Sequence, residues 1–100
     1  MSSSTIPKLF GSKMNRGSLP SNANLNNYYG EANVGVWYVG ATTSMSNLPP
    51  SPNDYGHLIV LYSGGMTNQT MVRNQRIYSR QYSGSPITWT SWYTYEGGTV

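Results

Sequence analysis

The ionisable residues that could carry catalysis are few and widely separated in this chain. The acidic residues are Glu31, Asp54 and Glu96, and the single histidine is His57. A glycosidase needs two carboxylates held at a fixed separation on rigid elements, and the one conceivable pair is Glu31 and Asp54. Asp54, His57 and one of many serines could compose a hydrolytic triad, but no G-x-S-x-G elbow accompanies them. We therefore expect solvated acids, a histidine that makes one hydrogen bond, and no enzyme.

Ligands for a metal ion or a cofactor are equally scarce. The chain contains no cysteine, and one histidine with three scattered acids makes a poor set of metal ligands. The pairs at residues 64–65 and 97–98 are glycines of a turn and a tail, not a phosphate-binding loop. We expect neither a metal nor a cofactor.

The aromatic residues carry more information than the ionisable ones. Nine tyrosines and three tryptophans stand in a chain of 100 residues with only 9% charged residues. These rings exceed what one small core can hold, so some must be exposed or lie in an interface. Tyrosine and tryptophan bury a large area and keep a polar handle, which suits protein interfaces. Sugars also stack their C–H faces on such rings, so both readings are binding functions.

Two groups of residues are candidates for contacting a ligand. Arg76 and Arg80 are four apart in an expected strand, so they share a face with two tyrosines and could hold an acidic sugar or a partner carboxylate. The alternative is that these arginines stack on the tyrosines for packing alone. The second group ends a long Pro-rich loop, residues 44–55, since loops on a rigid scaffold often carry function. The predicted ligand-binding residues are Asn53, Asp54, Tyr55, His57, Arg76, Tyr78 and Arg80.

Strands must position these residues, because β-branched and aromatic side chains dominate the segments around them. Residues 76–95 read as two strands joined by a Ser-Gly-Ser-Pro turn. Strict alternation in the second strand puts Trp89 and Trp92 on opposite faces, so we expect a second layer or a second chain over Trp92. Residues 34–40 alternate, with Val36 and Tyr38 opposite Trp37. Residues 57–63 are nearly continuous apolar, which is typical of a strand buried on both faces.

The remaining segments complete an all-β domain. Residues 67–74 form a weaker strand, and residues 22–30 form a short helical turn near residue 25, capped by Asn22 or Asn24. Residues 1–21 show no period and are expected to be an N-terminal linker or arm. The sequence thus predicts one domain, residues 22–100, as a small antiparallel sheet or sandwich of about five strands.

Charge and hydropathy restrict the possible partners. The net charge is +3, without the dense basic stripe that nucleic-acid binding usually needs. No segment approaches the ~20 apolar residues of a membrane span, and no signal peptide is visible, so we expect synthesis in a cytoplasm without membrane insertion. Scarce surface charge leaves sheet edges unguarded. Association, as an oligomer or in a larger assembly, is therefore expected.

A series of short motifs runs in order through residues 24–95. It comprises an Asn-Leu-Asn start, a first strand with Gly and Tyr, a P…G-x-L-x-V strand, a Q…Y-x-R strand and a final W-x-x-W. The residues are Asn24, Leu25, Asn26, Gly35, Tyr38, Pro52, Gly56, Leu58, Val60, Gln69 or Gln75, Tyr78, Arg80, Trp89 and Trp92. This order resembles the knob domains at the C-terminal ends of bacteriophage tail fibres and R-type pyocin fibres. The first strand departs from that pattern by reading Gly-Val-Trp-Tyr, and the N-terminal arm matches nothing in it.

The resemblance implies a homotrimeric knob at the tip of a tail fibre on a virion, made in the host cytoplasm and released by lysis. Its partners would be the remainder of the fibre and a bacterial cell-surface glycan or protein, with carbohydrate favoured. It implies no shared catalytic site, and the motif residues Tyr78, Arg80, Trp89 and Trp92 would be structural. One alternative is a trimerisation or capping module without a ligand. Another is an enzyme that cleaves a surface polysaccharide.

Overall fold

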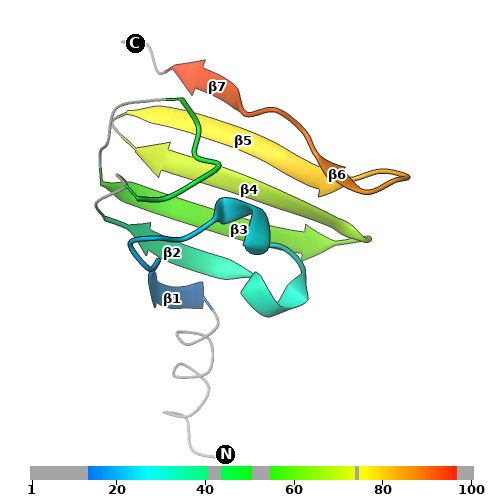
Figure 1. Ribbon diagram of the computed structural model, residues 1–100, viewed down its shortest axis with the longest axis horizontal. Helices are drawn as coiled ribbons and strands as arrows, with labels where there is room; N and C mark the ends of the chain where they lie inside the picture. Colours follow the sequence, from blue (N-terminus) through cyan, green and yellow to red (C-terminus); the bar gives the residue numbers. More distant parts are fainter. Residues whose placement is uncertain (1–13, 41–43, 51–54, 74, 97–100) are drawn as a thin grey trace, which may run out of the picture.

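A computed structural model describes residues 14–40, 44–50, 55–73 and 75–96 of the chain (Figure 1). Their regular elements are seven strands and two short 3-10 turns, so the prediction of a mostly-β domain is confirmed. The elements are β1 (Asn15–Ser18), η1 (Leu25–Asn27), η2 (Glu31–Asn33), β2 (Gly35–Val39), β3 (Gly56–Ser63), β4 (Met66–Arg73), β5 (Arg76–Ser83), β6 (Thr88–Trp89) and β7 (Tyr93–Glu96).

The strands form one mixed sheet in the order β1-β2-β3-β4-β5, with β6 and β7 both paired to the outer edge of β5. Every pairing is antiparallel except β1 with β2, which is parallel. The predicted small antiparallel sheet or sandwich of about five strands is therefore corrected to one mixed sheet of seven strands, which is parallel at the β1 edge. Parallel neighbours need a crossover connection. Residues 19–34 supply it and carry both 3-10 turns across one face of the sheet (Figure 1).

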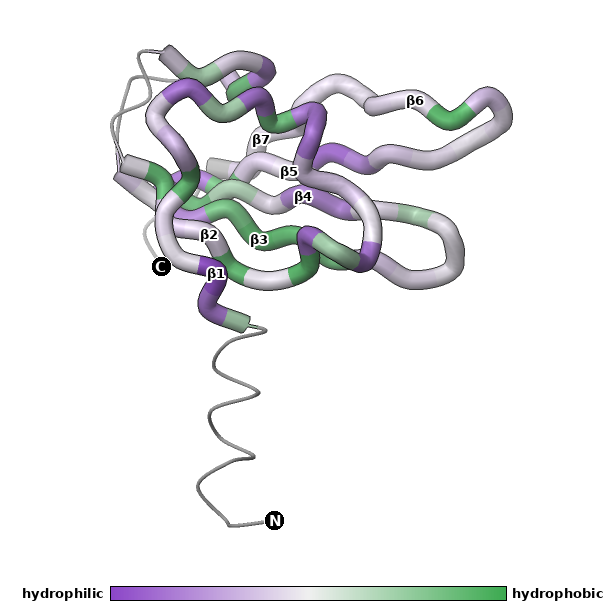
Figure 2. The backbone as a smooth tube through the Cα atoms, turned by 60° about the horizontal axis from the view of Figure 1, so that its bottom comes forward, coloured by the Kyte–Doolittle hydropathy of each residue, from purple (hydrophilic) through white to green (hydrophobic). Residues whose placement is uncertain are grey.

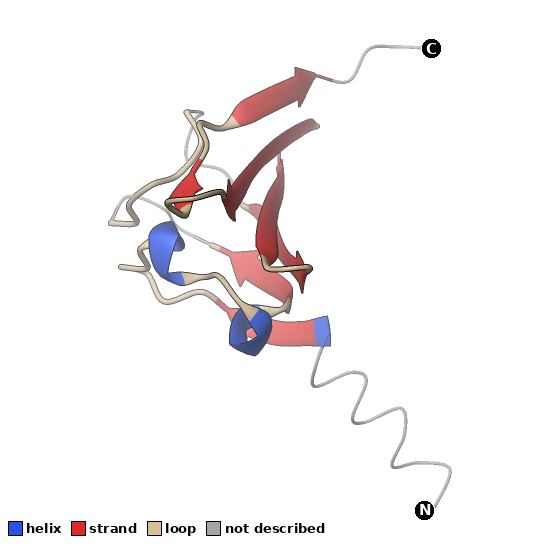
Figure 3. Ribbon diagram, turned by 90° about the vertical axis from the view of Figure 1, so that its right-hand side faces the viewer, coloured by secondary structure: helices blue, strands red, loops and turns tan. Residues whose placement is uncertain are grey.

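The sheet consequently has a covered face and an open face (Figure 3). The cross-strand register aligns Trp37, Leu58, Met71 and Tyr78 on the covered face, where the core lies. The neighbouring register positions, which begin with Tyr38 and His57, point to the open face. The predicted alternation of residues 34–40 is thereby confirmed.

The covering layer is built from two segments far apart in the sequence. The Asn24 side chain accepts a hydrogen bond from the Asn26 N–H at 3.0 Å, which caps η1, so the predicted turn near residue 25 is confirmed. Leu25 is fully buried beneath the turn. Residues 44–50 lie beside this turn. The Ser46 N–H donates a hydrogen bond to the Ala23 carbonyl, and the Ser46 carbonyl accepts one from the Leu25 N–H. Part of the Pro-rich loop is thus packed structure.

The final strand is interrupted, and this corrects the predicted positions of the tryptophans. Tyr82 pairs with Trp89 and Ser79 pairs with Tyr93, so two residues of β5 face three residues between β6 and β7. One extra residue in a strand reverses which side chains face the core. Trp89 and Trp92 therefore both lie on the covered face. The second layer expected over Trp92 is present, since its indole N–H donates to the Asn47 carbonyl at 3.1 Å.

Candidate functional site

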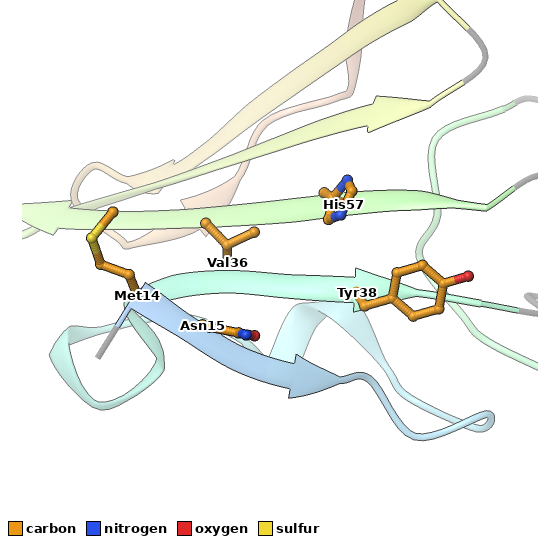
Figure 4. Close-up of a pocket in the computed structure, with 5 residues that line it drawn as sticks. All are labelled: Met14, Asn15, Val36, Tyr38 and His57. Atoms are coloured by element: carbon orange, nitrogen blue, oxygen red, sulfur yellow. The ribbon is translucent and has the colours of Figure 1, made fainter. Parts of the chain in front are cut away.

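A hollow of about 380 Å³ lies on the open face where β1, β2 and β3 meet (Figure 4). Its lining residues are Met14, Asn15, Val36, Tyr38 and His57. Tyr38 and His57 are direct cross-strand partners, and Val36 is two residues before Tyr38, so the pleat turns all three to the same face. The hollow opens to solvent, and its volume lies at the lower end of the range for small-ligand sites.

Aromatic rings line the outer end of this hollow. The Tyr38 and Tyr55 rings stack nearly parallel, with centroids 6.3 Å apart and an interplanar angle of 12°. The His57 ring meets Tyr38 edge-on at 6.0 Å. Tyr55 is 69% exposed, so most of its ring faces solvent. We name Asn15, Tyr38, Tyr55 and His57 the aromatic corner.

The aromatic corner combines flat apolar faces with polar groups at their rims. Tyrosine hydroxyls, the His57 nitrogens and the Asn15 amide can donate or accept hydrogen bonds. The Asn15 side-chain oxygen Oδ1 already accepts a hydrogen bond from the Gly17 N–H at 3.1 Å, which holds that side chain in place. Such a set can stack on an apolar ring face and bond the hydroxyls around it, but it offers no paired carboxylates for acid–base chemistry.

The structure brings together two of the predicted ligand-binding residues, Tyr55 and His57. Sequence reasoning missed their neighbours Tyr38 and Asn15. The alternation of β2 placed Tyr38 on the correct face, but nothing indicated which strand would lie beside it. Asn53 and Asp54 lie outside the described residues.

The other predicted ligand-binding residues lie on the opposite, covered face. Arg76, Tyr78, Arg80 and Tyr82 share that face, as their spacing predicted. Tyr78 belongs to the core, and Arg76 is partly exposed near the sheet edge. Arg80 is only 6% exposed. This placement favours a packing role for Arg80, although the rings that it contacts are those of Trp89 and Trp92 and not the tyrosines of the predicted alternative.

Arg80 joins the sheet to the covering layer. Its guanidinium carbon lies 3.9 Å from the centre of the Trp89 ring and 4.6 Å from that of Trp92. Its Nε donates to the Gln69 side-chain oxygen at 2.8 Å, and Nη1 donates to the Asn26 side chain at 2.9 Å. Burial lowers the pKa of Arg80 to about 10, so the group stays charged at neutral pH. Two π faces and two hydrogen bonds replace part of the water that this cation loses, while its Nη2 is buried without a hydrogen-bond partner among the described residues.

A second hollow, of about 320 Å³, lies on the open face across β4, β5 and β7. Amide and hydroxyl side chains line it beside two exposed tyrosines. These residues include Asn68, Ser79, Gln81, Thr90, Tyr93 and Tyr95. The hollow is separate from the aromatic corner, because β7 lies near the opposite edge of the sheet from β1.

The described parts of the chain contain no group of three His, Cys, Asp or Glu residues that is placed to hold a metal ion. Glu31 lies exposed on η2, and Asp54 falls outside the described ranges. No helix in residues 14–40, 44–50, 55–73 or 75–96 has the length and apolar character to cross a membrane.

No family model matches the chain, and no curated protein or solved structure is significantly similar to it. The resemblance to fibre knob domains therefore stays a prediction.

Proposed function

We propose that this chain is a non-enzymatic attachment domain that binds carbohydrate on a bacterial surface, as a homotrimer at the tip of a bacteriophage-type tail fibre. The observation that carries the proposal is the aromatic corner, where the exposed, stacked rings of Tyr38 and Tyr55 lie beside His57. The order of motifs through residues 24–95 supports the fibre context.

The chemistry of the aromatic corner suits a sugar. A pyranose presents an apolar C–H face that can lie on the Tyr55 ring and hydroxyls that can bond the nearby His57. Asn15 pairs with Val36 at the other end of the hollow, so its amide would bond a further sugar of a longer saccharide. The corner is open and shallow, so we expect weak affinity at each site. Three copies on one fibre tip, and several tips on one particle, would multiply weak contacts into firm attachment.

A second candidate function is a trimerisation or capping module that binds no receptor. One observation favours it: apolar side chains remain uncovered on the open face, as Leu61 does at 54% exposure. The two functions are compatible, because one domain can assemble through one part of a face and bind through another.

The test is binding of the purified chain to an array of bacterial surface polysaccharides. Tyr55→Ala removes the most exposed ring of the aromatic corner and should weaken binding about tenfold or more, since ~1 kcal/mol lost at each of three sites acts together. The matched control is Tyr62→Ala, because Tyr62 is 41% exposed on the opposite face of β3. The Tyr62→Ala protein should bind polysaccharide as the wild type does.

Three results would count against the proposal. They are the absence of any polysaccharide binding by the wild type, equal binding by the Tyr55→Ala protein, and shortening of the polysaccharide during the assay. The last would favour the enzyme, and single substitutions of Glu31, Asp54 and Glu96 would then locate its acids.

A further inference from the structure

The open face of the sheet carries an apolar surface that the described chain does not cover. Figure 3 shows that the 3-10 turns and the loops around them, among the described residues, lie on one side of the strands. Ile59 and Val36 are partly exposed there, and Leu61, Val72 and Ile77 are exposed. In Figure 2 the most hydrophobic stretch of the backbone runs along β3 and its neighbour β2.

The pattern of β3 points to burial on both faces. Leu58 and Val60 are fully buried in the core, while Ile59 and Leu61 alternate with them on the open face. A strand with one wet face normally alternates apolar with polar side chains. The sequence of β3 is therefore that of a strand covered on both faces, and the described residues of one chain cover only one of them.

Charge is also missing from the open face. The arginines of β4 and β5 (Arg73, Arg76 and Arg80) lie on the covered-face register. Arg16 extends over the Trp37 ring and donates to the Val34 carbonyl. Among the described residues of β2 to β5 on the open face, His57 is the one Lys, Arg, His, Asp or Glu. A sheet that faces water normally carries charged side chains that prevent association.

An apolar hollow and two protruding tyrosine rings lie near opposite edges of the open face. The apolar hollow, of about 360 Å³, is lined by residues that include Met14, Val36, Ile59 and Leu61 on the β1–β3 side. Tyr93 and Tyr95, 63% and 61% exposed, stand on β7 beyond β5. Their separation within one chain prevents the rings from filling their own hollow.

We propose that the open face is the surface through which copies of this chain assemble, with Tyr93 and Tyr95 of one copy filling the apolar hollow of the next. Two different, complementary surfaces form a head-to-tail contact, and such a contact closes into a ring of three copies when each copy is rotated by one third of a turn from the last. Neither of the two surfaces carries charge, so they meet without like-charge repulsion. This inference rests on the homotrimer of the proposed function, and names the surface that builds it.

The open face supplies part of the area that such an assembly needs. Its strands (three of eight residues, one of five and two of four), at about 3.4 Å per residue and about 4.8 Å apart, outline a face of roughly 600 Å². Each copy in a ring makes two contacts, so this face provides roughly 300 Å² to each of them. A stable interface buries about 800 Å² on each partner, and neighbouring surfaces of the chain must supply the rest. The hollow beside the aromatic corner shares Met14 and Val36 with the apolar hollow, so the corner lies next to this contact.

The test is the solution mass of the chain by light scattering across a range of concentrations. The wild type should give three times 11.0 kDa. Leu61→Lys, which puts a charge into the apolar hollow, and the double variant Tyr93→Ala/Tyr95→Ala should each give a single-chain mass. Tyr62→Lys is the matched control, because Tyr62 adjoins Leu61 on the opposite face, and it should keep the wild-type mass. Circular dichroism checks that each variant keeps the fold.

Mixing the two single-chain variants tests the pairing of rings and hollow directly. The Leu61→Lys chain keeps its rings and the Tyr93→Ala/Tyr95→Ala chain keeps its hollow, so a mixture should form a two-chain species. A wild type of single-chain mass, an unchanged mass for Leu61→Lys, or no association in the mixture would overturn the proposal. The wild type could also have a single-chain mass and bind a hydrophobic dye only after residues 1–13 are removed. That result would overturn the proposal and would show that the N-terminal segment covers the open face.

The outcome is separable from that of the receptor assay. Tyr55→Ala should weaken glycan binding and leave the mass unchanged. Leu61→Lys should lower the mass to that of a single chain. Its one binding site should still bind glycan when the glycan is presented at high density. A single-chain protein that binds glycans would sink the assembly proposal alone, and a trimer that binds none would sink the receptor proposal alone.

Discussion

The buried amide of Gln69 should contribute more to stability than any exposed polar group of the sheet. Its NH₂ group donates to the carbonyls of Leu25 and Tyr28 at 2.7 and 2.8 Å, and its oxygen accepts from Arg80. Gln69→Leu keeps the size of the side chain but leaves two carbonyls and one cationic N–H without these partners. Each neutral bond contributes about 1 kcal/mol and the charged one about 1.5–3 kcal/mol, so unfolding should become easier by roughly 3–5 kcal/mol.

That loss is large for a domain of this size, whose total stability is of order 5–15 kcal/mol. The assay is urea denaturation at one fixed chain concentration, followed by tryptophan fluorescence. A fixed concentration is needed because assembly would add its own stabilisation. Gln81→Leu is the matched control: its amide bonds only the Ser83 hydroxyl, so the change should stay within about 1 kcal/mol.

A double-mutant cycle with Arg80→Met then isolates the bond between the two side chains. We expect a coupling free energy of about 1–3 kcal/mol, because the two groups touch within one buried network. Equal stability of the Gln69→Leu and Gln81→Leu proteins would refute the reasoning. So would a coupling free energy near zero, since the Arg80 contact would then add nothing.

Three further predictions follow from the same layer and sheet. Gly56→Ala should destabilise the domain by about 1–3 kcal/mol in urea, because a Cβ there would overlap the neighbouring strand at Arg73; a protein of wild-type stability would contradict the register. Trp92→Phe should lose about 1 kcal/mol with its bond to the Asn47 carbonyl, and an unchanged denaturation midpoint would mean that the bond is not formed. Burial lowers the pKa of Arg80 to about 10, so the unfolded chain holds this proton more tightly than the folded one. The free energy of unfolding of the wild type should therefore rise, relative to that of Arg80→Met, as pH increases above about 10. Parallel pH curves for those two proteins would contradict this.

The parts of the fold that sequence could predict are those with local signals. Asn24 before Leu25 marks a capped turn, and the turn is there. The alternation of β2 and the apolar run of β3 also identified their strands. In contrast β1 reads Asn-Arg-Gly-Ser, without alternation or β-branched residues, and it forms because the crossover layer returns the chain beside it. Such a strand depends on tertiary context, so no local pattern predicts it.

The candidate site was predictable only in part, for the same reason. Tyr55 and His57 were found because they end a long loop at the start of a strand. Tyr38 joins them through strand order, which one sequence does not reveal. Arg80 looked like a surface arginine beside tyrosines, and one extra residue between β6 and β7 turned both tryptophans toward it. Alternation cannot anticipate a bulge, since the interruption is not visible in the residue types.

The most direct test of the account is an NMR titration of the ¹⁵N-labelled chain with the bacterial polysaccharide that binds best on the array. We expect amide shifts concentrated at residues 36–39 and 55–58 and at Asn15, which together surround the aromatic corner. Shifts confined to the hollow across β4, β5 and β7, or none with any polysaccharide, would contradict the claim that the corner is the attachment site.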